Sequence, residues 1–150
     1  MLLIAHRGCI DGPNETRENS PDFILEAIQL GFDVEIDVNV VGSDIMLGHD
    51  RPQYKIEVSF LKNSHLWCHA KNLEALGFLL SNGIRCFWHQ EDDYTITSDG
   101  YIWAYPGRAI LHDRCVIVLP ESANYTNLEL SQAMAICTDY PIKYQKEFNF

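Results

Sequence analysis

Two acidic residues, Glu35 and Asp37, occupy alternate positions of an otherwise apolar segment, Asp-Val-Glu-Ile-Asp-Val-Asn-Val-Val, at 33–41. Residues two positions apart on a β-strand point to the same side, so these two carboxylates would lie close together. They would repel each other unless a cation or a proton lay between them. Carboxylate oxygens suit Mg²⁺, Ca²⁺ or Mn²⁺, which makes a metal site one interpretation. Ordinary acids on a solvent-exposed strand face are the other.

Two histidines each follow a short apolar run. His6 and Arg7 come directly after Leu2–Ala5, and His49 with Asp50 comes after a second short run. In β/α barrels the carboxyl ends of the strands carry the active site. An arginine there can hold a phosphate oxygen, and a histidine can transfer a proton near neutral pH. Either step taken alone would also fit an ordinary polar turn.

The elements that would position these residues begin with a buried strand at 2–5. A helix follows, because Ser20 can cap it, Pro21 suits its first position and Gly31 can end it. The strand at 33–41 comes next. This β-α-β order predicts parallel pairing at the start of the chain.

The rest of the chain reads mainly as β structure, with 52–63 interpreted as a loop. Further strands are expected at 45–47, 65–70, 84–88, 94–98, 101–105, 115–119 and 135–138, and further helices at 72–80, capped by Asn72, and at 128–135. About eight strand-like segments and three helices result. At 150 residues the chain is one domain, 1–150, and far shorter than the ~250 residues of a full β/α barrel. The fold class predicted is therefore α/β, a reduced TIM-like β/α barrel with few outer helices.

The formal charge of −10 argues against binding nucleic acid or an anionic membrane surface. No stretch approaches the ~20 apolar residues of a membrane span, and the N-terminus lacks the apolar core of a signal peptide. Five cysteines, an odd number, include no C-x-x-C pair, and all except Cys9 lie in apolar runs. Together these features predict a cytoplasmic location. Missing helices would leave apolar barrel surface uncovered, so a homo-oligomer is expected.

Four segments taken in order resemble the glycerophosphodiester phosphodiesterase family. They are Ile4-Ala5-His6-Arg7-Gly8, Glu18-Asn19-Ser20, Gly31-Phe32-Asp33-Val34-Glu35-Ile36-Asp37-Val38 and Gly48-His49-Asp50. The resemblance implies that His6 and His49 are the acid/base pair and that Arg7 binds phosphate. It also implies that Glu35 and Asp37 hold a divalent metal, Mg²⁺ or Ca²⁺. The later segment 135–141 looks like the closing strand of that family.

The middle of the chain departs from the family. A Glu-x-Lys strand usually completes the metal site there, and the best counterpart in this chain is His69-Ala70-Lys71. Lys71 fits as a phosphate ligand, whereas His69 stands in place of the glutamate. An imidazole ligand would favour Mn²⁺ or Zn²⁺. Another acid such as Glu121 could instead complete the site, or the site could bind metal weakly.

Trp88 and His89 stand where the family has an aromatic strand end near the substrate. Trp88 would line the pocket and His89 would contact the phosphate or a sugar hydroxyl; core packing and a loop position are the alternatives.

The function expected is metal-dependent hydrolysis of a small phosphodiester that carries a glycerol, polyol or sugar group. Two alternatives stay open. One is a degenerate barrel that binds phosphate-bearing ligands without turnover, which the replacement by His69 favours. The other is a lyase or transferase acting on phosphate-bearing glycans.

Overall fold

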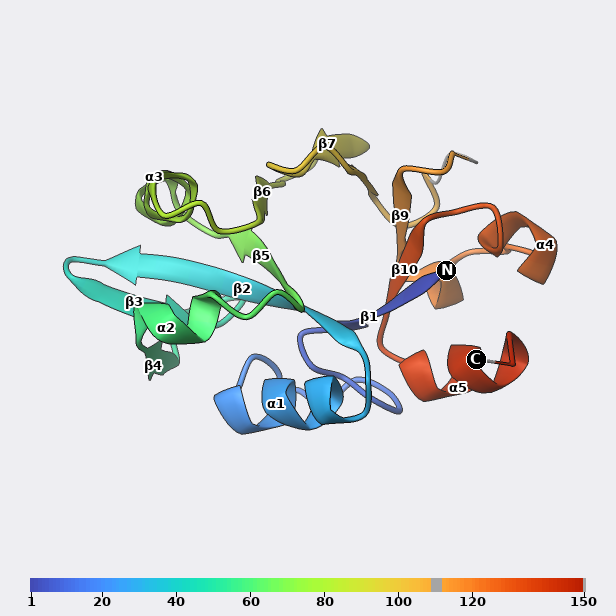
Figure 1. Cartoon of the computed structure of the whole chain (residues 1–150), viewed down its shortest axis with the longest axis horizontal. Coiled ribbons are helices and arrows are strands. Elements are labelled where there is room, and N and C mark those ends of the chain that lie inside the picture. Colours follow the sequence, from blue (N-terminus) through green and yellow to red (C-terminus); the bar gives the residue numbers. More distant parts are fainter. Residues whose placement is uncertain (109–111, 150) are drawn as a thin grey trace.

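The computed structural model describes residues 1–108 and 112–149 as a mixed α/β structure (Figure 1). Its strands are β1 (Leu2–His6), β2 (Asp33–Val41), β3 (Asp44–Leu47), β4 (Tyr54–Ile56), β5 (Leu66–Ala70), β6 (Cys86–Trp88), β7 (Tyr94–Ile96), β8 (Ile102–Ala104), β9 (Cys115–Val118) and β10 (Ala135–Thr138). Its helices are α1 (Pro21–Gln29), α2 (Val58–Leu61), α3 (Leu73–Ser81), the 3₁₀ helix η1 (Pro120–Ser122), α4 (Asn127–Leu130) and α5 (Pro141–Glu147).

Eight of the strands form one curled sheet, a half-barrel in the order β6-β5-β2-β1-β10-β9-β8-β7. All neighbours in it are parallel except β7, which is antiparallel to β8. The remaining strands, β3 and β4, extend the sheet from the far end of β2 as antiparallel neighbours. The α/β class and the curled eight-stranded sheet with few helices are therefore confirmed.

The two ends of the curled sheet, β6 and β7, lie close together in Figure 1. They are joined by loop and side-chain hydrogen bonds rather than by a strand ladder. The backbone N–H of Ser98 donates to the carbonyl of Cys86 at 2.8 Å, and the Thr95 hydroxyl donates to the carbonyl of Trp88 at 2.8 Å.

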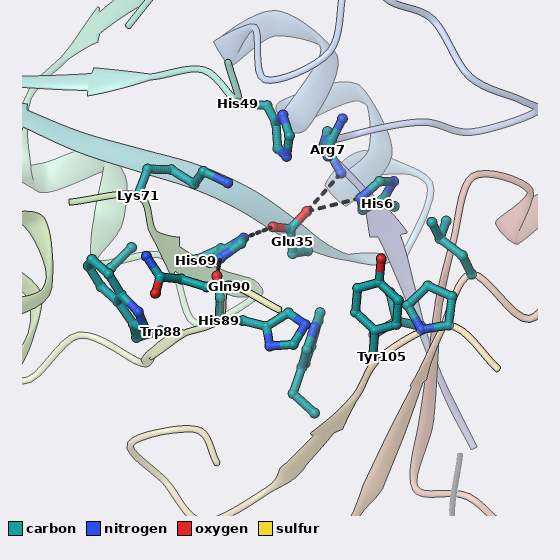
Figure 2. A pocket seen from close by; sticks show the side chains of 15 residues that line it. His6, Arg7, Glu35, His49, His69, Lys71, Trp88, His89, Gln90 and Tyr105 are labelled. Atoms are coloured by element: carbon teal, nitrogen blue, oxygen red, sulfur yellow. Dashed lines mark hydrogen bonds and ion pairs between the residues drawn. The ribbon is translucent and has the colours of Figure 1, made fainter. Parts of the chain in front are cut away.

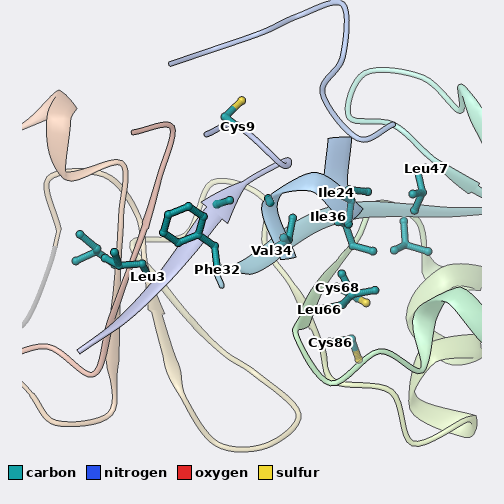
Figure 3. Close-up of a cluster of buried hydrophobic side chains, with 14 of the residues drawn as sticks. Leu3, Cys9, Ile24, Phe32, Val34, Ile36, Leu47, Leu66, Cys68 and Cys86 are labelled. Atoms are coloured by element: carbon teal, nitrogen blue, oxygen red, sulfur yellow. The ribbon is translucent and has the colours of Figure 1, made fainter. Parts of the chain in front are cut away.

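The alternation expected on β2 is confirmed. Val34, Ile36 and Val38 belong to the apolar cluster between the sheet and the helices, where α1 and α3 lie against β2 (Figure 3). Of the acids at the intervening positions, Glu35 points into the cavity on the concave side (Figure 2), and Asp37, two positions further along the strand, shares that face. That side is filled by a second cluster, which includes Ile4, Trp67, Phe87, Trp103, Val116, Val118, Ala135 and Cys137.

Local capping follows the sequence signals. The side chain of Ser20 accepts a hydrogen bond from the N–H of Phe23 and begins α1. Asn72 accepts from the N–H of Ala75 at 2.9 Å and begins α3. The Asn72 amide also donates to the carbonyl of Val40 at 2.9 Å, so the same residue fastens α3 to β2.

Three sequence interpretations are wrong. The segment 52–63 is not a loop, because it holds β4 and α2. The helix expected at 128–135 is only the single turn α4, since the N–H of Met134 already donates to the carbonyl of Cys115 in the neighbouring strand. Helix α5 was not predicted from the sequence. Most of its residues are polar, so the few apolar residues that pack against β1 gave no clear helical pattern.

All five cysteines are buried, including Cys9, which the sequence pattern does not place in an apolar run. Burial raises the pKa of Cys9 to about 12, so its thiol is a poor nucleophile. The side chains of His65 and His112 are exposed. Among residues 1–108 and 112–149, no helix is both long and apolar enough to cross a membrane.

Strand β7 exposes two large side chains, Tyr94 at 45% and Ile96 at 65%. Exposed apolar surface of this kind is what the expectation of a homo-oligomer rests on. That expectation stays a prediction.

Helix α3 should stabilise the fold through one face only. Leu79 is fully buried against the sheet, whereas its neighbour Leu80 is 54% exposed. We expect Leu79→Ala to lower the free energy of unfolding by about 2–5 kcal/mol, because it leaves a cavity. The matched control Leu80→Ala should change it by less than about 0.5 kcal/mol. Urea unfolding followed by circular dichroism measures both, and equal losses would contradict this packing.

Candidate functional site

A cavity of about 490 Å³ opens at the carboxyl ends of the parallel strands (Figure 2). Its lining includes every residue proposed from the sequence for acid/base, phosphate or substrate contacts: His6, Arg7, His49, Lys71, Trp88 and His89. Glu35 and His69 also line it. Asp37 lies beneath the surface and is fully buried. The sequence-predicted residues therefore come together in one place, although their roles stay predictions.

Glu35, Asp37 and His69 form a cluster whose ligand atoms all lie within 4.8 Å of one another. The Nδ1 atom of His69 is 3.2 Å from Asp37 Oδ1 and 3.7 Å from Glu35 Oε1. Strand pairing creates this proximity, because Asp37 on β2 is the direct register partner of His69 on β5. The three side chains come from adjacent strands of a rigid sheet, so their spacing is largely set by the backbone.

The orientation of His69 is fixed from two sides. Its Nε2 lies 3.0 Å from the carbonyl oxygen of His89, and a carbonyl can only accept a hydrogen bond. Its ring stacks on Phe87 with the ring centroids 4.9 Å apart. In the neutral imidazole this places the proton on Nε2 and a lone pair on Nδ1, facing the two carboxylates. That is the tautomer a metal ligand at Nδ1 requires.

Asp37 is surrounded by donors and cations. The Asn19 amide donates to Asp37 Oδ2 at 2.9 Å, and Asn19 Oδ1 accepts from the Asp37 N–H at 2.8 Å. Arg7 Nε is 3.2 Å from Asp37 Oδ2, and Lys71 Nζ is 3.6 Å from Asp37 Oδ1. Burial would raise the pKa of Asp37, but a hydrogen bond from His69 when its Nδ1 is protonated, together with the charges of Arg7 and Lys71, outweighs burial and lowers it. Asp37 is therefore ionised.

Glu35 is under the opposite influence. Burial and the nearby charge of Asp37 raise the pKa of Glu35 above its ordinary value. Asp37 Oδ1 is buried and has no hydrogen-bond partner in the part of the chain that the structure describes. Two buried carboxylates, one of them with an unsatisfied oxygen, beside a histidine lone pair are the donor set that a divalent cation would satisfy.

His6 belongs to a carboxylate–histidine pair. Its Nδ1 is 2.8 Å from Asp139 Oδ1, and its Nε2 faces Glu35 at 4.0 Å. Burial lowers the pKa of His6, but the hydrogen bond to Asp139 and the charge of Glu35 outweigh burial and raise it. Sequence reasoning gave Asp139 no role. The rule that identified His6, a polar residue directly after an apolar strand, would also have identified Asp139 after β10.

Glu121, the other acid considered for the metal site, lies outside the cluster of Glu35, Asp37 and His69 and has other partners. One of its carboxylate oxygens accepts a hydrogen bond from the Thr138 hydroxyl and the other from the N–H of Asp139, both at 2.9 Å. Glu121 therefore fixes the start of the loop that carries Asp139, and through Asp139 it acts on the orientation of His6.

Arg7 is held in an unusual backbone conformation, with φ at +53°. Its N–H donates to the carbonyl of Glu35 at 2.9 Å, and its Nη1 is 3.1 Å from Glu18 Oε2. Asn19 also has a positive φ, and its N–H donates to the carbonyl of Arg7 at 3.0 Å. Glu18 thus positions the guanidinium group of Arg7, and Asn19 positions both the backbone of Arg7 and the carboxylate of Asp37.

His49 is placed by the turn that follows β3. The N–H of Gly48 donates to the carbonyl of Asp37 at 3.1 Å, and the Asn39 amide donates to the carbonyl of Gly48 at 2.8 Å. A Cβ at Gly48 would meet the carbonyl oxygen of Arg51 at 2.1 Å, so only glycine fits there. Nδ1 of His49 is 2.6 Å from Asp50 Oδ1.

Trp88 combines the two roles considered for it, because it lines the cavity and also packs against the outer apolar cluster. His89 lies between His69 and Tyr105, and burial lowers the pKa of its ring. Sequence reasoning had assigned no site role to Tyr105, Trp103 or Leu119, which also line the cavity. Tyr105 directly follows β8, a position that the strand-end rule could have marked.

No protein-family model, curated protein or solved structure matches this chain. The case for a function therefore rests on the site.

Asn19 should stabilise the site through its two hydrogen bonds to Asp37. Asn19→Gly keeps the positive φ and removes both hydrogen bonds to Asp37, so we expect a loss of about 1–3 kcal/mol in unfolding free energy. Asn19→Ala should lose about 1 kcal/mol more, because a Cβ disfavours that φ. Asn149, exposed and also at positive φ, provides the control, since Asn149→Gly should have little effect. Chemical denaturation measures all three, and a fully stable Asn19→Gly protein would contradict the assignment.

Proposed function

We propose that this chain is a metal-dependent phosphodiester hydrolase, a short and divergent member of the glycerophosphodiester phosphodiesterase family on a reduced TIM-like barrel. One observation carries the proposal. Two histidines, each paired with a carboxylate, line the same cavity as two cations and a carboxylate–histidine cluster. A phosphodiester is the substrate class whose cleavage needs all three kinds of group together.

Glu35, Asp37 and His69 would hold the metal. The unsatisfied Asp37 Oδ1 and the orientation of His69 support this assignment. An imidazole nitrogen among the ligands favours Mn²⁺ or Zn²⁺, whereas an all-oxygen set would favour Mg²⁺ or Ca²⁺. When bound, such a cation neutralises phosphate oxygens and lowers the pKa of a hydroxyl group beside it.

Arg7 and Lys71 would bind the phosphate. Both reach the cavity while they interact with Asp37, so their charges are held beside the metal ligands rather than in bulk solvent. Arg7 also has Glu18 as a partner, which fixes the direction of its guanidinium group. Fixed cations of this kind stabilise the charge that develops on phosphate oxygens in the transition state.

His6 and His49 would act as base and acid. Asp139 and Asp50 bind the Nδ1 side of their rings, which leaves Nε2 of each histidine to exchange a proton with the substrate. One Nε2 takes the proton of the attacking hydroxyl group, and the other protonates the departing alkoxide.

The attacking hydroxyl group belongs either to water or to the substrate itself. Labelled water distinguishes them, because only direct hydrolysis places one ¹⁸O on phosphorus in the first product.

The metal assignment predicts a loss of binding in two conservative variants. Glu35→Gln and Asp37→Asn remove a ligand charge without changing side-chain volume. We expect the affinity for Mn²⁺ to fall by at least about 10-fold in each variant. A loss of that size is already typical when a residue that only orients a metal ligand is replaced, and a ligand itself should matter more. The exposed Glu57→Gln serves as the control. Isothermal titration calorimetry measures the affinities, and unchanged Mn²⁺ binding in both variants would rule the ligands out.

The acid/base assignment decides between an enzyme and a binding protein. Once a screen of phosphodiesters with several divalent metals has given a substrate, His6→Ala and His49→Ala should each lower turnover by about 10²–10⁴-fold. Affinity for the substrate should change much less, because Arg7 and Lys71 remain. The exposed His112→Ala is the control.

A protein that only binds phosphate compounds would give no turnover even before mutation. Full turnover in both histidine variants would show that the acid/base assignment is wrong, whatever the metal does.

A further inference from the structure

The cavity has two unlike walls. Strands β1, β2 and β5, with the residues that directly follow β1 and β5, supply charged groups, among them Arg7, Glu35 and Lys71. The ends of β8 and β9 supply only uncharged groups to it: Trp103, Tyr105, Pro106, Val118 and Leu119. Because β8 and β9 are direct neighbours in the sheet, these side chains form one continuous surface. A phosphate on the charged wall would therefore hold its substituent against an apolar wall.

His89 borders that wall. Its ring centroid is 5.5 Å from that of Tyr105 (Figure 2). Both of its ring nitrogens are buried, and neither has a hydrogen-bond partner within residues 1–108 and 112–149. Buried ring nitrogens without partners are costly, and a ligand with polar atoms on its edge would satisfy them.

A second, polar groove of about 430 Å³ adjoins the cavity. Arg7 and His49 line both, so the two spaces meet where the phosphate is expected. Beyond them the groove is lined by Glu15, Glu18, Asp50, Arg51 and Gln53. Among the described residues it has no Phe, Tyr or Trp side chain, and its carboxylates and amides suit hydroxyl groups.

We propose that the substrate is an unsymmetrical phosphodiester, with a ring-bearing group in the cavity and a small hydroxylated group in the polar groove. The ring lies against Tyr105 and Trp103 and presents a polar edge to His89. Both a nucleoside and a sugar ring have this chemistry, an apolar face with hydrogen-bonding atoms around it. This inference rests on the proposed function for the position of the phosphate, and it adds the class of substrate.

Binding of monoesters tests the ring site without requiring turnover. Calorimetry on the Mn²⁺-loaded protein compares phenyl phosphate with methyl phosphate, which differ only in the ring. We expect phenyl phosphate to bind about ten-fold more tightly, and Tyr105→Ala to abolish most of that preference. Tyr94→Ala, which removes an equally exposed tyrosine away from both spaces, should leave the preference intact. Equal affinities, or a preference that survives Tyr105→Ala, would overturn the ring site.

Two further comparisons test the polar contacts. His89→Phe should weaken binding of uridine 5′-monophosphate or glucose 1-phosphate, whichever the parent protein binds better, and leave phenyl phosphate unaffected. Glu15→Ala should lower the preference for phenyl glyceryl phosphodiester over phenyl methyl phosphodiester by about five-fold, with Glu57→Ala as the control. Unchanged preferences in these variants would contradict the assigned polar edge and groove.

The outcome also separates the two proposals. If a diester is hydrolysed while the two monoesters bind equally, the phosphodiesterase function stands and the substrate class is wrong. If phenyl phosphate is preferred through Tyr105 but no diester is hydrolysed with any metal, the ring site stands and the proposed function fails. Failure of both monoesters to bind would overturn the substrate class.

Discussion

Two carboxylates buried side by side on strand β2 are the constraint around which this structure is arranged. Glu35 is 2% exposed and Asp37 is fully buried, and the alternation of the strand forces both to the concave face. Their mutual repulsion, in a region with little water, must be offset by positive charge or by donors. Arg7, Lys71 and Asn19 surround Asp37 from three directions. A protonated His69, with the charges of Arg7 and Lys71, accounts for the lowered pKa of Asp37.

The remainder of the fold supports this charged layer from below and from the sides. Trp67, Phe87 and Trp103 fill the concave side beneath it, and the ring of Phe87 stacks directly under His69. The helices cover the opposite face, where Val34 and Ile36 belong to the outer core. A single strand thus presents its apolar residues to the helices and its acids to the cavity. The geometry of the site therefore depends on the packing that holds β2 in place.

The sequence predicted β2 well because strict alternation reports both faces of a strand. His6 and Arg7 followed from their position at the end of an apolar strand, whereas His69 and Lys71 followed from the family resemblance. Asp139 and Glu121 show where this reasoning stops. Their roles depend on which strand lies beside β1, and β10 reaches that place from 133 residues away, the separation between His6 and Asp139. Pairing between distant strands leaves little local signal. The short helix α5 was missed for a related reason, because its burial against β1 is visible only in three dimensions.

In the proposed site a divalent cation, rather than a proton on His69, compensates the charges of Glu35 and Asp37. Nitrogen-15 NMR of the histidine rings, recorded with and without Zn²⁺, distinguishes the two directly. The account predicts that His69 keeps a proton on Nε2 alone and that its Nδ1 resonance shifts on saturation with Zn²⁺, a shift that Glu35→Gln weakens. A His69 ring protonated on both nitrogens, unchanged at saturating Zn²⁺, would contradict it and identify His69 as the cationic partner of Asp37.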